Sequence, residues 1–215
     1  MTTGSNKIQS EELATQQAEA LLPTEWGDFV ISAHTDDMGD YTPHIVLKHP
    51  ELDKTSAVHL RVHSECITGD IFHSQKCDCG EQLHESMKIL TEQKGILIYL
   101  RQEGRGIGII NKLKAYKHQE KGLDTIQANE ALGLASDYRE YDVAAAILKS
   151  LHVKKVKLIT NNPDKVSGLN TYGIEVVERI PLIIKPTKNS ADYLRTKQEE
   201  MGLSLIHISE PTRPY

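Results

Sequence analysis

The chain contains three cysteines, and all of them lie within one short window, HSECITGDIFHSQKCDCGEQL. Cys66, Cys77 and Cys79 follow the spacing C-x10-C-x-C, which differs from the paired CxxC of zinc fingers. Clustered thiols in a chain without a signal peptide are more typical of a metal site than of a disulfide framework. Thiolate sulfur is a strong zinc donor, so the pattern predicts a zinc site.

Three protein ligands leave two interpretations of that zinc site open. A catalytic zinc ion keeps its fourth position for water, whereas a structural one is closed by a fourth side chain. His63, His73, Asp70 and Asp78 are the candidates for closing it. Spacing alone favours neither role, and inert buried thiols are a third interpretation. In the catalytic case Glu65, next to the first cysteine, is a candidate for holding the water or acting as a base.

Two further segments carry groups that suit an anion. Residues 101–108, RQEGRGIG, contain three glycines and two arginines, which lets the backbone approach an anion before a helix N-terminus. They form neither a P-loop nor a dinucleotide fingerprint. Residues 160–165, TNNPDK, follow an expected strand, where ligands of α/β sheets commonly bind. Taken singly, both segments are more often a plain turn and a helix start, and SDYR with Asp137 and Arg139 is equally unremarkable.

An alternation of strands and helices must position these segments. Short apolar or alternating runs between Trp26 and His63 predict strands. Helical spacing of apolar residues predicts a helix over residues 81–93. The pattern as a whole predicts a sheet covered by helices, in an α/β or α+β arrangement. The remaining expected elements are a strand at 95–100, helices at 109–122 and 141–153, a strand at 154–160, a helix at 162–173 and a strand at 174–180.

Composition points away from nucleic-acid and membrane proteins. Hydrophobic residues make up 39% and charged residues 26%, as in ordinary globular proteins. The net charge of −5 lacks the basic surplus of a nucleic-acid binder, and aromatic residues reach only 5%. No apolar run approaches the roughly 20 residues that span a bilayer, and no signal-type stretch opens the chain. We therefore expect a cytoplasmic protein that binds neither nucleic acid nor membrane.

The length of 215 residues fits one large domain or two small ones. Residues 1–17 are polar and are predicted to be a disordered or frayed lead-in to a domain over residues 18–203. Residues 204–215, SLIHISEPTRPY, break the preceding helical pattern and resemble translated vector read-through. We predict that they are a non-native tail, whose removal leaves activity and melting temperature unchanged.

Seven motifs occur in one order along the chain, namely RVHSECxTGD, KCDCGxQL, RQEGRGIG, NKLxAY, GxDTxxAN, DxRxY and TNNPxK. Together with AEALLPTEWGDF and ERIPLI they resemble GTP cyclohydrolase II from about Ala18 to Gly202. A single motif would be weak evidence, but seven in register are very specific. The resemblance implies an α/β fold, with a mixed sheet flanked by helices, and a homodimer.

The resemblance also implies ligands. Cys66, Cys77 and Cys79 match the three zinc ligands of the family, with water in the fourth position, which favours the catalytic interpretation. Mg²⁺ is expected to bridge oxygens of the GTP phosphates. The positions that match GTP contacts are Arg61, Val62, His63, Ser64, Glu65, Gln82, Glu103, Gly104, Arg105, Thr125, Thr160 and Lys165.

Three further residues match catalytic positions of the family. Asp137 matches the proton acceptor and Arg139 the nucleophile toward the α-phosphate. Because guanidinium is almost always protonated, a role for Arg139 as a phosphate clamp fits its chemistry better. Tyr116 matches a tyrosine beside the reacting ring, which favours complete removal of the ring carbon over a formamide product.

The implied reaction is hydrolysis of GTP at the guanine imidazole ring, with release of formate and diphosphate. The product, 2,5-diamino-6-(5-phosphoribosylamino)pyrimidin-4-one, is the first intermediate of riboflavin biosynthesis. Because about 20 residues precede the matching region, we expect the stand-alone form without a dihydroxybutanone-phosphate synthase domain. The alternatives are a relative that stops at the formamide or acts in pyrimidine catabolism, a nucleotide-binding regulator with structural zinc, and a zinc-ribbon-like nucleic-acid binder.

Overall fold

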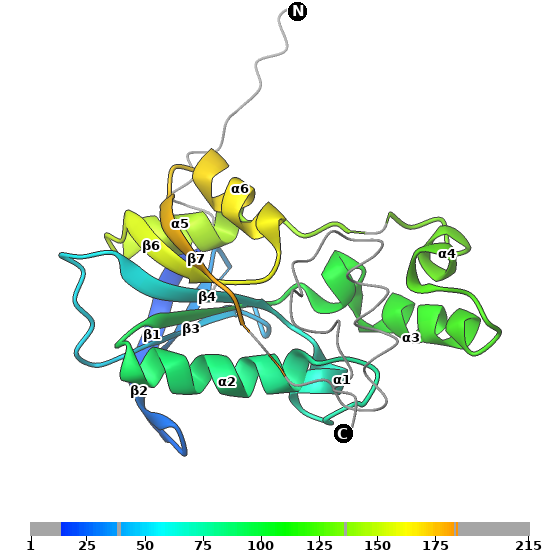
Figure 1. Cartoon of the computed structure of the whole chain (residues 1–215), viewed down its shortest axis with the longest axis horizontal. Coiled ribbons are helices and arrows are strands. Elements are labelled where there is room, and N and C mark those ends of the chain that lie inside the picture. Colours follow the sequence, from blue (N-terminus) through cyan, green and yellow to red (C-terminus); the bar gives the residue numbers. More distant parts are fainter. Residues whose placement is uncertain (1–13, 38–39, 136, 183, 185–215) are drawn as a thin grey trace, which may run out of the picture.

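Seven strands form one sheet at the centre of the computed structural model, which describes residues 14–37, 40–135, 137–182 and 184 (Figure 1). Across the sheet the strand order is β1-β2-β3-β5-β4-β6-β7. The strands in chain order are β1 (Thr15–Thr24), β2 (Gly27–Thr35), β3 (His44–Lys48), β4 (Val58–Ser64), β5 (Ile96–Leu100), β6 (Lys155–Ile159) and β7 (Glu175–Ile180).

The sheet is mixed, as the family resemblance implies. Strands β1, β2, β3 and β5 pair antiparallel, whereas β5, β4, β6 and β7 pair parallel. Ser64 lies opposite Leu100 in the register of β4 and β5, and Leu60 lies opposite Leu158 in that of β4 and β6. The carboxyl ends of the three central parallel strands therefore share one edge, where ligands of α/β sheets commonly bind.

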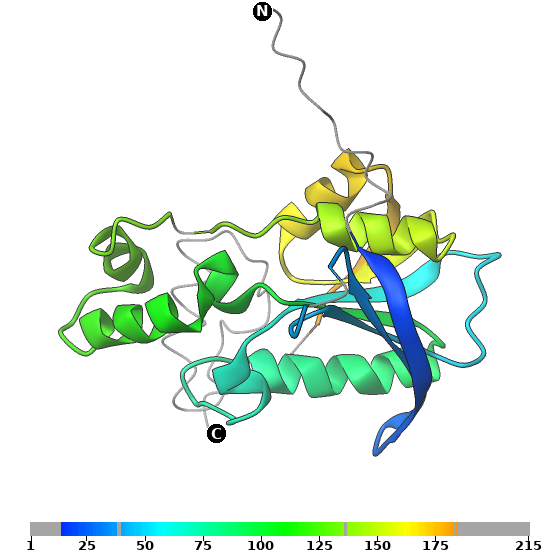
Figure 2. The same ribbon diagram turned by 180° about the vertical axis from the view of Figure 1, so that it is seen from behind.

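Helices cover both faces of the sheet. On one face lies α2 (Cys79–Glu92), and on the other lie α5 (Asp142–Ser150) and α6 (Pro163–Thr171) (Figures 1 and 2). Side chains of β5 alternate between the two layers, as the two-residue period of a strand requires. Ile96 and Ile98 join the core beneath α5, while Leu97 joins the smaller core beneath α2.

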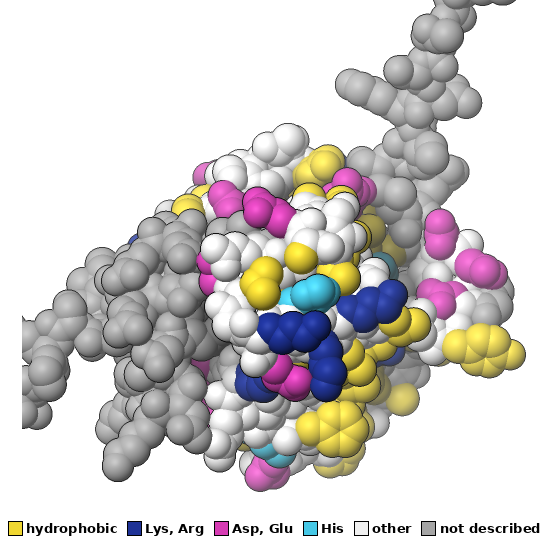
Figure 3. Space-filling model, turned by 90° about the vertical axis from the view of Figure 1, so that its right-hand side faces the viewer, with side chains coloured by type: hydrophobic (Ala, Val, Ile, Leu, Met, Phe, Trp, Pro, Cys, Tyr) yellow, Lys and Arg dark blue, Asp and Glu magenta, His cyan; other side chains and the backbone are white. Residues whose placement is uncertain are grey.

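The remaining helices project beyond the edge at which the parallel strands end. There α3 (Gly108–Gln119) packs on α4 (Thr125–Glu130) and on the short 3₁₀ turn η1 (Glu103–Gly106), while α1 (Ile67–Asp70) directly follows β4 (Figures 1 and 2). The view from this side shows lysine and arginine side chains grouped around a histidine, with hydrophobic side chains beside them (Figure 3). On helix α3, Ile110 and Leu113 are exposed, while Lys112 contacts Cys66.

Most expected elements occur within two or three residues of their predicted bounds, but strand β1 corrects one expectation. It begins at Thr15, inside the range 1–17 that the sequence predicts to be a frayed lead-in. Strand β1 is exposed along most of its length, because it is the outermost strand of the sheet and pairs with β2 alone among the described strands. Its sequence consequently lacks the alternation that marks a half-buried strand. The tail at 204–215 and the C-terminal end of the predicted domain lie outside the described residues.

Within the described ranges, no helix is both long enough and apolar enough to cross a membrane.

Candidate functional site

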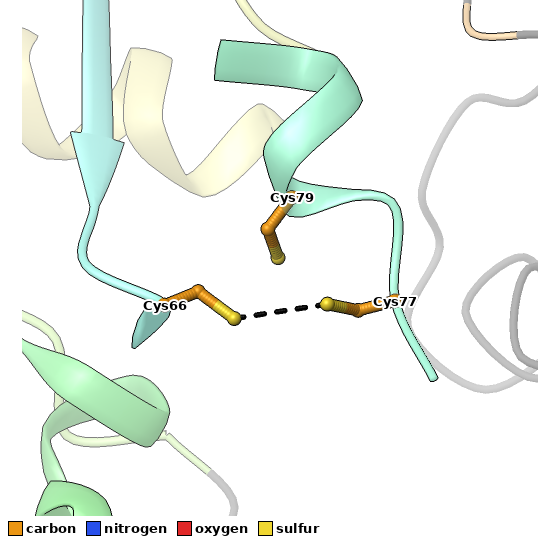
Figure 4. Close-up of side chains that lie close together, drawn as sticks. All are labelled: Cys66, Cys77 and Cys79. Carbon is orange, nitrogen blue, oxygen red and sulfur yellow. Dashed lines mark hydrogen bonds between the residues drawn. The ribbon is translucent and has the colours of Figure 1, made fainter. Parts of the chain in front are cut away.

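The three cysteines come together at the edge where the parallel strands end (Figure 4). Cys66 follows β4, Cys77 lies in the loop after α1, and Cys79 begins α2. All three sulfur atoms lie within 4.8 Å of one another, and those of Cys66 and Cys77 are 3.7 Å apart. In a tetrahedral zinc–thiolate site, with zinc–sulfur bonds of about 2.3 Å, two sulfurs are separated by about 3.8 Å. The arrangement therefore fits the zinc ion that the sequence predicts.

Two glycines make room for this cluster. A Cβ atom on Gly69 would lie 2.7 Å from the sulfur of Cys77 and 3.3 Å from that of Cys66. A Cβ atom on Gly80 would lie 2.4 Å from the carbonyl oxygen of Gly69. Because any larger residue would collide with sulfur or backbone, the local sequence reserves this space for the sulfurs and what they bind.

No histidine or carboxylate joins the cysteine cluster in the described part of the chain. Three of the four residues proposed as a fourth ligand, Asp70, His63 and Asp78, make contacts elsewhere. Asp70 accepts hydrogen bonds from the backbone N–H of Cys66 at 2.9 Å and from the hydroxyl of Tyr99 at 2.8 Å, and it pairs with His63 Nε2 at 3.0 Å. Asp78 accepts a hydrogen bond from the Gln82 amide at 2.7 Å.

The thiols of Cys66 and Cys77 differ in pKa. Hydrogen bonds from Cys77 and Cys79 lower the pKa of the Cys66 thiol, and the ammonium of Lys112 lowers it further. The hydrogen bond to Cys66 raises the pKa of Cys77 to about 11. Cys66 is thus the sulfur on which negative charge concentrates. Soft anionic sulfur is the donor that zinc prefers.

Lys112 belongs to the motif NKLxAY, but the sequence gives it no role, and the structure places it in the site. Its Nζ donates hydrogen bonds to Cys66 Sγ at 3.1 Å, Thr68 Oγ1 at 2.9 Å and Glu103 Oε1 at 2.8 Å. Burial opposes its charge, but the hydrogen bonds to Glu103 and Cys66 outweigh burial and raise the pKa of Lys112. The lysine therefore carries its positive charge beside the first cysteine.

Tyr116 lies one helical turn after Lys112 on α3, so both face the cysteine loop. The ammonium of Lys76 lies 4.5 Å from the centroid of the Tyr116 ring. Burial raises the pKa of Tyr116, so its hydroxyl keeps its proton. The structure thus brings the predicted tyrosine to the cysteine loop.

Both carboxylate oxygens of Glu103 accept hydrogen bonds from other segments of the chain. Besides its contact with Lys112, it accepts a hydrogen bond from the backbone N–H of Ile67 at 2.6 Å. This pair of contacts ties η1 to α1 and α3. Next to it, Gly104 and the non-glycine Arg105 both have φ of 62°, a left-handed conformation that is uncommon for arginine. The carbonyl oxygen of Arg105 accepts a hydrogen bond from the N–H of Tyr138.

A chain of buried polar groups leads from β4 to α2. Arg61 donates one hydrogen bond to the Ile159 carbonyl oxygen at 3.0 Å and another to Gln82 Oε1 at 2.6 Å. Gln82 in turn donates a hydrogen bond to Asp78. Burial lowers the pKa of Arg61 to about 10, which leaves it charged at neutral pH.

Lys165 is a second buried basic residue beside the same strand. It donates a hydrogen bond to the Val62 carbonyl oxygen at 2.7 Å, and burial lowers its pKa. Thr160 is also buried at the end of β6, where its hydroxyl accepts a hydrogen bond from the backbone of Asn162.

Strand β4 carries most of the buried polar atoms that have no partner. Of the five such side-chain atoms in the described residues, three belong to Arg61, His63 and Ser64. Buried polar atoms are nearly always hydrogen-bonded in folded proteins, so these exceptions on one strand mark a place where a polar ligand or ordered water would bind. Glu65 follows directly and forms an ion pair with Arg101 at 3.0 Å. Burial raises the pKa of Glu65, which suits a group that exchanges protons.

Asp137 and Arg139 form an ion pair in the segment between α4 and α5. Arg139 Nε lies 2.9 Å from Asp137 Oδ1, and the guanidinium also donates to the second carboxylate oxygen. Burial favours a higher pKa for Asp137, but the contacts with Arg139 outweigh burial and lower it. The charges of both residues, of Arg61 and of Cys79 act on Lys165. Lys165 therefore lies within electrostatic reach of both the ion pair and Cys79.

Thr125 is the first residue of α4, which packs on α3. The structure thus brings the cysteines, the polar end of β4, Tyr116 and the ion pair to one edge of the sheet, and it places Thr125 on the projecting helices next to them.

The GTP cyclohydrolase II family model matches residues 15–181, which is most of the chain. The chain belongs to the GTP cyclohydrolase II family. The riboflavin biosynthesis protein RibBA of Bacillus cereus is 48% identical over 193 residues, which cover 89% of this chain and 48% of that protein. RibBA of Bacillus cytotoxicus gives the same figures. This GTP cyclohydrolase II family chain therefore spans about half the length of the curated relatives it matches.

A solved structure, a two domain 3,4-dihydroxy-2-butanone 4-phosphate synthase from A. baumannii, aligns with a TM-score of 0.44 and 19% identity over 80% of this chain and 41% of that chain.

Proposed function

We propose that the chain binds GTP at this edge of the sheet and opens the imidazole ring of its guanine, releasing formate and diphosphate. The product would be 2,5-diamino-6-(5-phosphoribosylamino)pyrimidin-4-one, the first intermediate of riboflavin biosynthesis. One water opens the ring, another releases the ring carbon as formate, and a third replaces diphosphate at the α-phosphate. The observation that carries the proposal is the cluster of three cysteine thiols beside the unpartnered polar atoms of β4.

Cys66, Cys77 and Cys79 would hold the zinc ion. When bound, zinc supplies a Lewis acid that activates water for attack on carbon. Glu65, next to the first cysteine, accepts or donates a proton, and its raised pKa supports that role. Arg61 donates a hydrogen bond that holds Gln82, and the two residues orient the guanine base. Complete removal of the ring carbon depends on Tyr116, whose protonated hydroxyl lies on the same side of α3 as Lys112.

The phosphates would bind farther along the same edge. Arg139 contacts the α-phosphate, and the paired carboxylate of Asp137 orients it and accepts its proton in the nucleophilic role that the family implies. Arg105 and Lys165 add positive charge, which stabilises the leaving diphosphate. Mg²⁺ bound to phosphate oxygens, a homodimer and a cytoplasmic location stay predictions.

Incubation of the purified protein with GTP, Zn²⁺ and Mg²⁺ tests the proposal. We expect equimolar formate and diphosphate and the absorbance of a diaminopyrimidine, all abolished by chelation and restored by zinc. A formamide product would point to a relative with incomplete hydrolysis. Cys66→Ser separates catalysis from structure, because a catalytic site predicts a folded but inactive variant. GTP binding without turnover, combined with unfolding of Cys66→Ser, would instead indicate a regulator with structural zinc.

A further inference from the structure

Lys112 reaches the cysteine cluster from outside the central sheet. It lies on α3, which projects beyond the sheet edge, and only 11% of its side chain is exposed. The three N–H groups of its ammonium meet three acceptors, the sulfur of Cys66, the hydroxyl of Thr68 and the carboxylate of Glu103. An ammonium group has three donors and no acceptor, so this contact set uses its full capacity.

The contact set argues against a role of Lys112 in binding phosphate. A lysine that contacts a substrate phosphate needs a free donor, whereas Lys112 would have to break one of three hydrogen bonds. Glu103 also binds the ammonium, and its second oxygen accepts a hydrogen bond from the Ile67 N–H. The nitrogen is therefore held in place before any substrate arrives.

The net charge of a zinc ion bound to three thiolates explains what a lysine at this position can do. Three thiolates carry one negative charge more than a divalent zinc ion neutralises, and this excess weakens the metal as a Lewis acid. A cation that hydrogen-bonds to a ligand sulfur withdraws electron density from that sulfur. Groups that contact metal ligands in this way tune the metal and often change activity by about 10–100-fold.

We propose that Lys112 is a positioning residue of the metal centre, whose N–H···S hydrogen bond lowers the electron density on Cys66. It acts through the cysteine and not on GTP. The link to turnover rests on the proposed function, but the contact with Cys66 does not. A measurement on the metal centre alone therefore tests the effect of Lys112 on Cys66 independently of GTP turnover.

Cobalt(II) bound in place of zinc provides that measurement, because its sulfur-to-metal charge-transfer band reports electron density on the ligand sulfurs. Lys112→Met keeps the apolar stem and removes the ammonium, and we expect its band to move to lower energy. Lys112→Arg keeps a charged N–H donor and should restore much of the wild-type position. The matched control is Lys114→Met, an exposed lysine on the same helix, which should leave the band in place.

An unchanged band in Lys112→Met overturns the proposal, whether or not the protein turns GTP over. Should that variant fail to fold, Lys112→Gln keeps a neutral N–H donor and should shift the band in the same direction by less. In the active protein we expect kcat to fall about 10–100-fold with KM for GTP nearly constant. A rise in KM at constant kcat would overturn the proposal in favour of a direct substrate contact.

Discussion

The space enclosed by the three sulfurs depends on a missing side chain at Gly69. Gly69→Ala would place a Cβ 2.7 Å from the sulfur of Cys77, closer than real contacts allow. The sulfur must move, while the core of the sheet, which lies elsewhere, is unaffected. We expect the variant to fold with near wild-type helix content but to bind zinc at least about 10-fold more weakly, as measured by chelator competition.

Gly133→Ala is the control for that substitution. Gly133 has φ of 68°, and a Cβ added there would meet no heavy atom within 4 Å, so alanine introduces backbone strain without a collision. It should lose some stability and keep full zinc affinity. Equal zinc affinity in the two variants would show that the space beside Gly69 is not needed by the metal.

A buried histidine of strand β2 makes stability depend on pH. Burial lowers the pKa of His34, whose Nε2 contacts the hydroxyl of Ser32 at 3.0 Å. The unfolded chain takes up this proton near the ordinary pKa of about 6.5, whereas the folded chain resists it. The contribution to stability is thus complete above pH 6.5 and is lost as pH falls toward the folded-state pKa. We expect the free energy of unfolding to decrease between about pH 7.5 and about pH 5.5.

Urea unfolding at both pH values tests this linkage. His34→Gln should reduce the pH dependence relative to wild type. His152→Asn is the control, because His152 is exposed and has φ of 59°, a conformation that asparagine tolerates. A pH dependence that persists unchanged in His34→Gln would assign the effect to other groups.

Among the elements, the projecting helix α4 depends on its N-terminal cap. Asp124 accepts a hydrogen bond from the Gln127 N–H at 2.8 Å, and the Gln127 side chain accepts one from the Asp124 N–H at 3.2 Å. Asp124→Ala should destabilise α4 by about 0.5–2 kcal/mol. Because α4 packs on α3 rather than on the sheet, we expect faster amide exchange in α4 without a comparable loss in global stability. Hydrogen-exchange mass spectrometry compares amide exchange in α4 with that in β5 of the sheet. An equal loss of protection in β5 would contradict this prediction.

Local pattern was sufficient to predict most of the elements. Helix α2 and strand β5 are indicated by their periods and by the Lys94-Gly95 stop between them. Strand β1 could not be found in this way, because an exposed edge strand has no buried face to impose an alternation. The pairing of β4 with both β5 and β6 also has no local signal, since those strands come from distant parts of the chain.

The same distinction explains which site residues the sequence does not reveal. The cysteines and the Asp137–Arg139 pair lie close in sequence, and motifs mark them. Lys112 meets Cys66 across 46 positions, and a lysine on an amphipathic helix is usually solvated. The sequence suggests Asp70 only as a fourth metal ligand, although its carboxylate joins Cys66 to Tyr99 of another strand. Such contacts depend on the sheet order, which single-sequence reasoning does not supply.

At the scale of the whole molecule, the core and the metal site are separate. The two hydrophobic layers combine residues of the central strands with residues of the helices α5 and α2, whereas the cysteines lie where the parallel strands end. A domain that buries this much apolar surface does not need a metal to fold, unlike a zinc finger. Metal bound only to the folded state still stabilises it, by about 2.7 kcal/mol at a free concentration of about 100 Kd.

Chelation should therefore lower the melting temperature without abolishing the fold. For a chain of this size about 1 kcal/mol corresponds to roughly 2–4 °C, so we expect a decrease of several degrees. Circular dichroism should show unchanged secondary structure and a single cooperative transition for the metal-free protein. Cys66→Ser should melt near the metal-free temperature and respond little to added zinc, because one of three ligands is gone. Collapse of the circular dichroism signal on chelation would mean that the sheet depends on the metal, and the cysteines would then have a structural role.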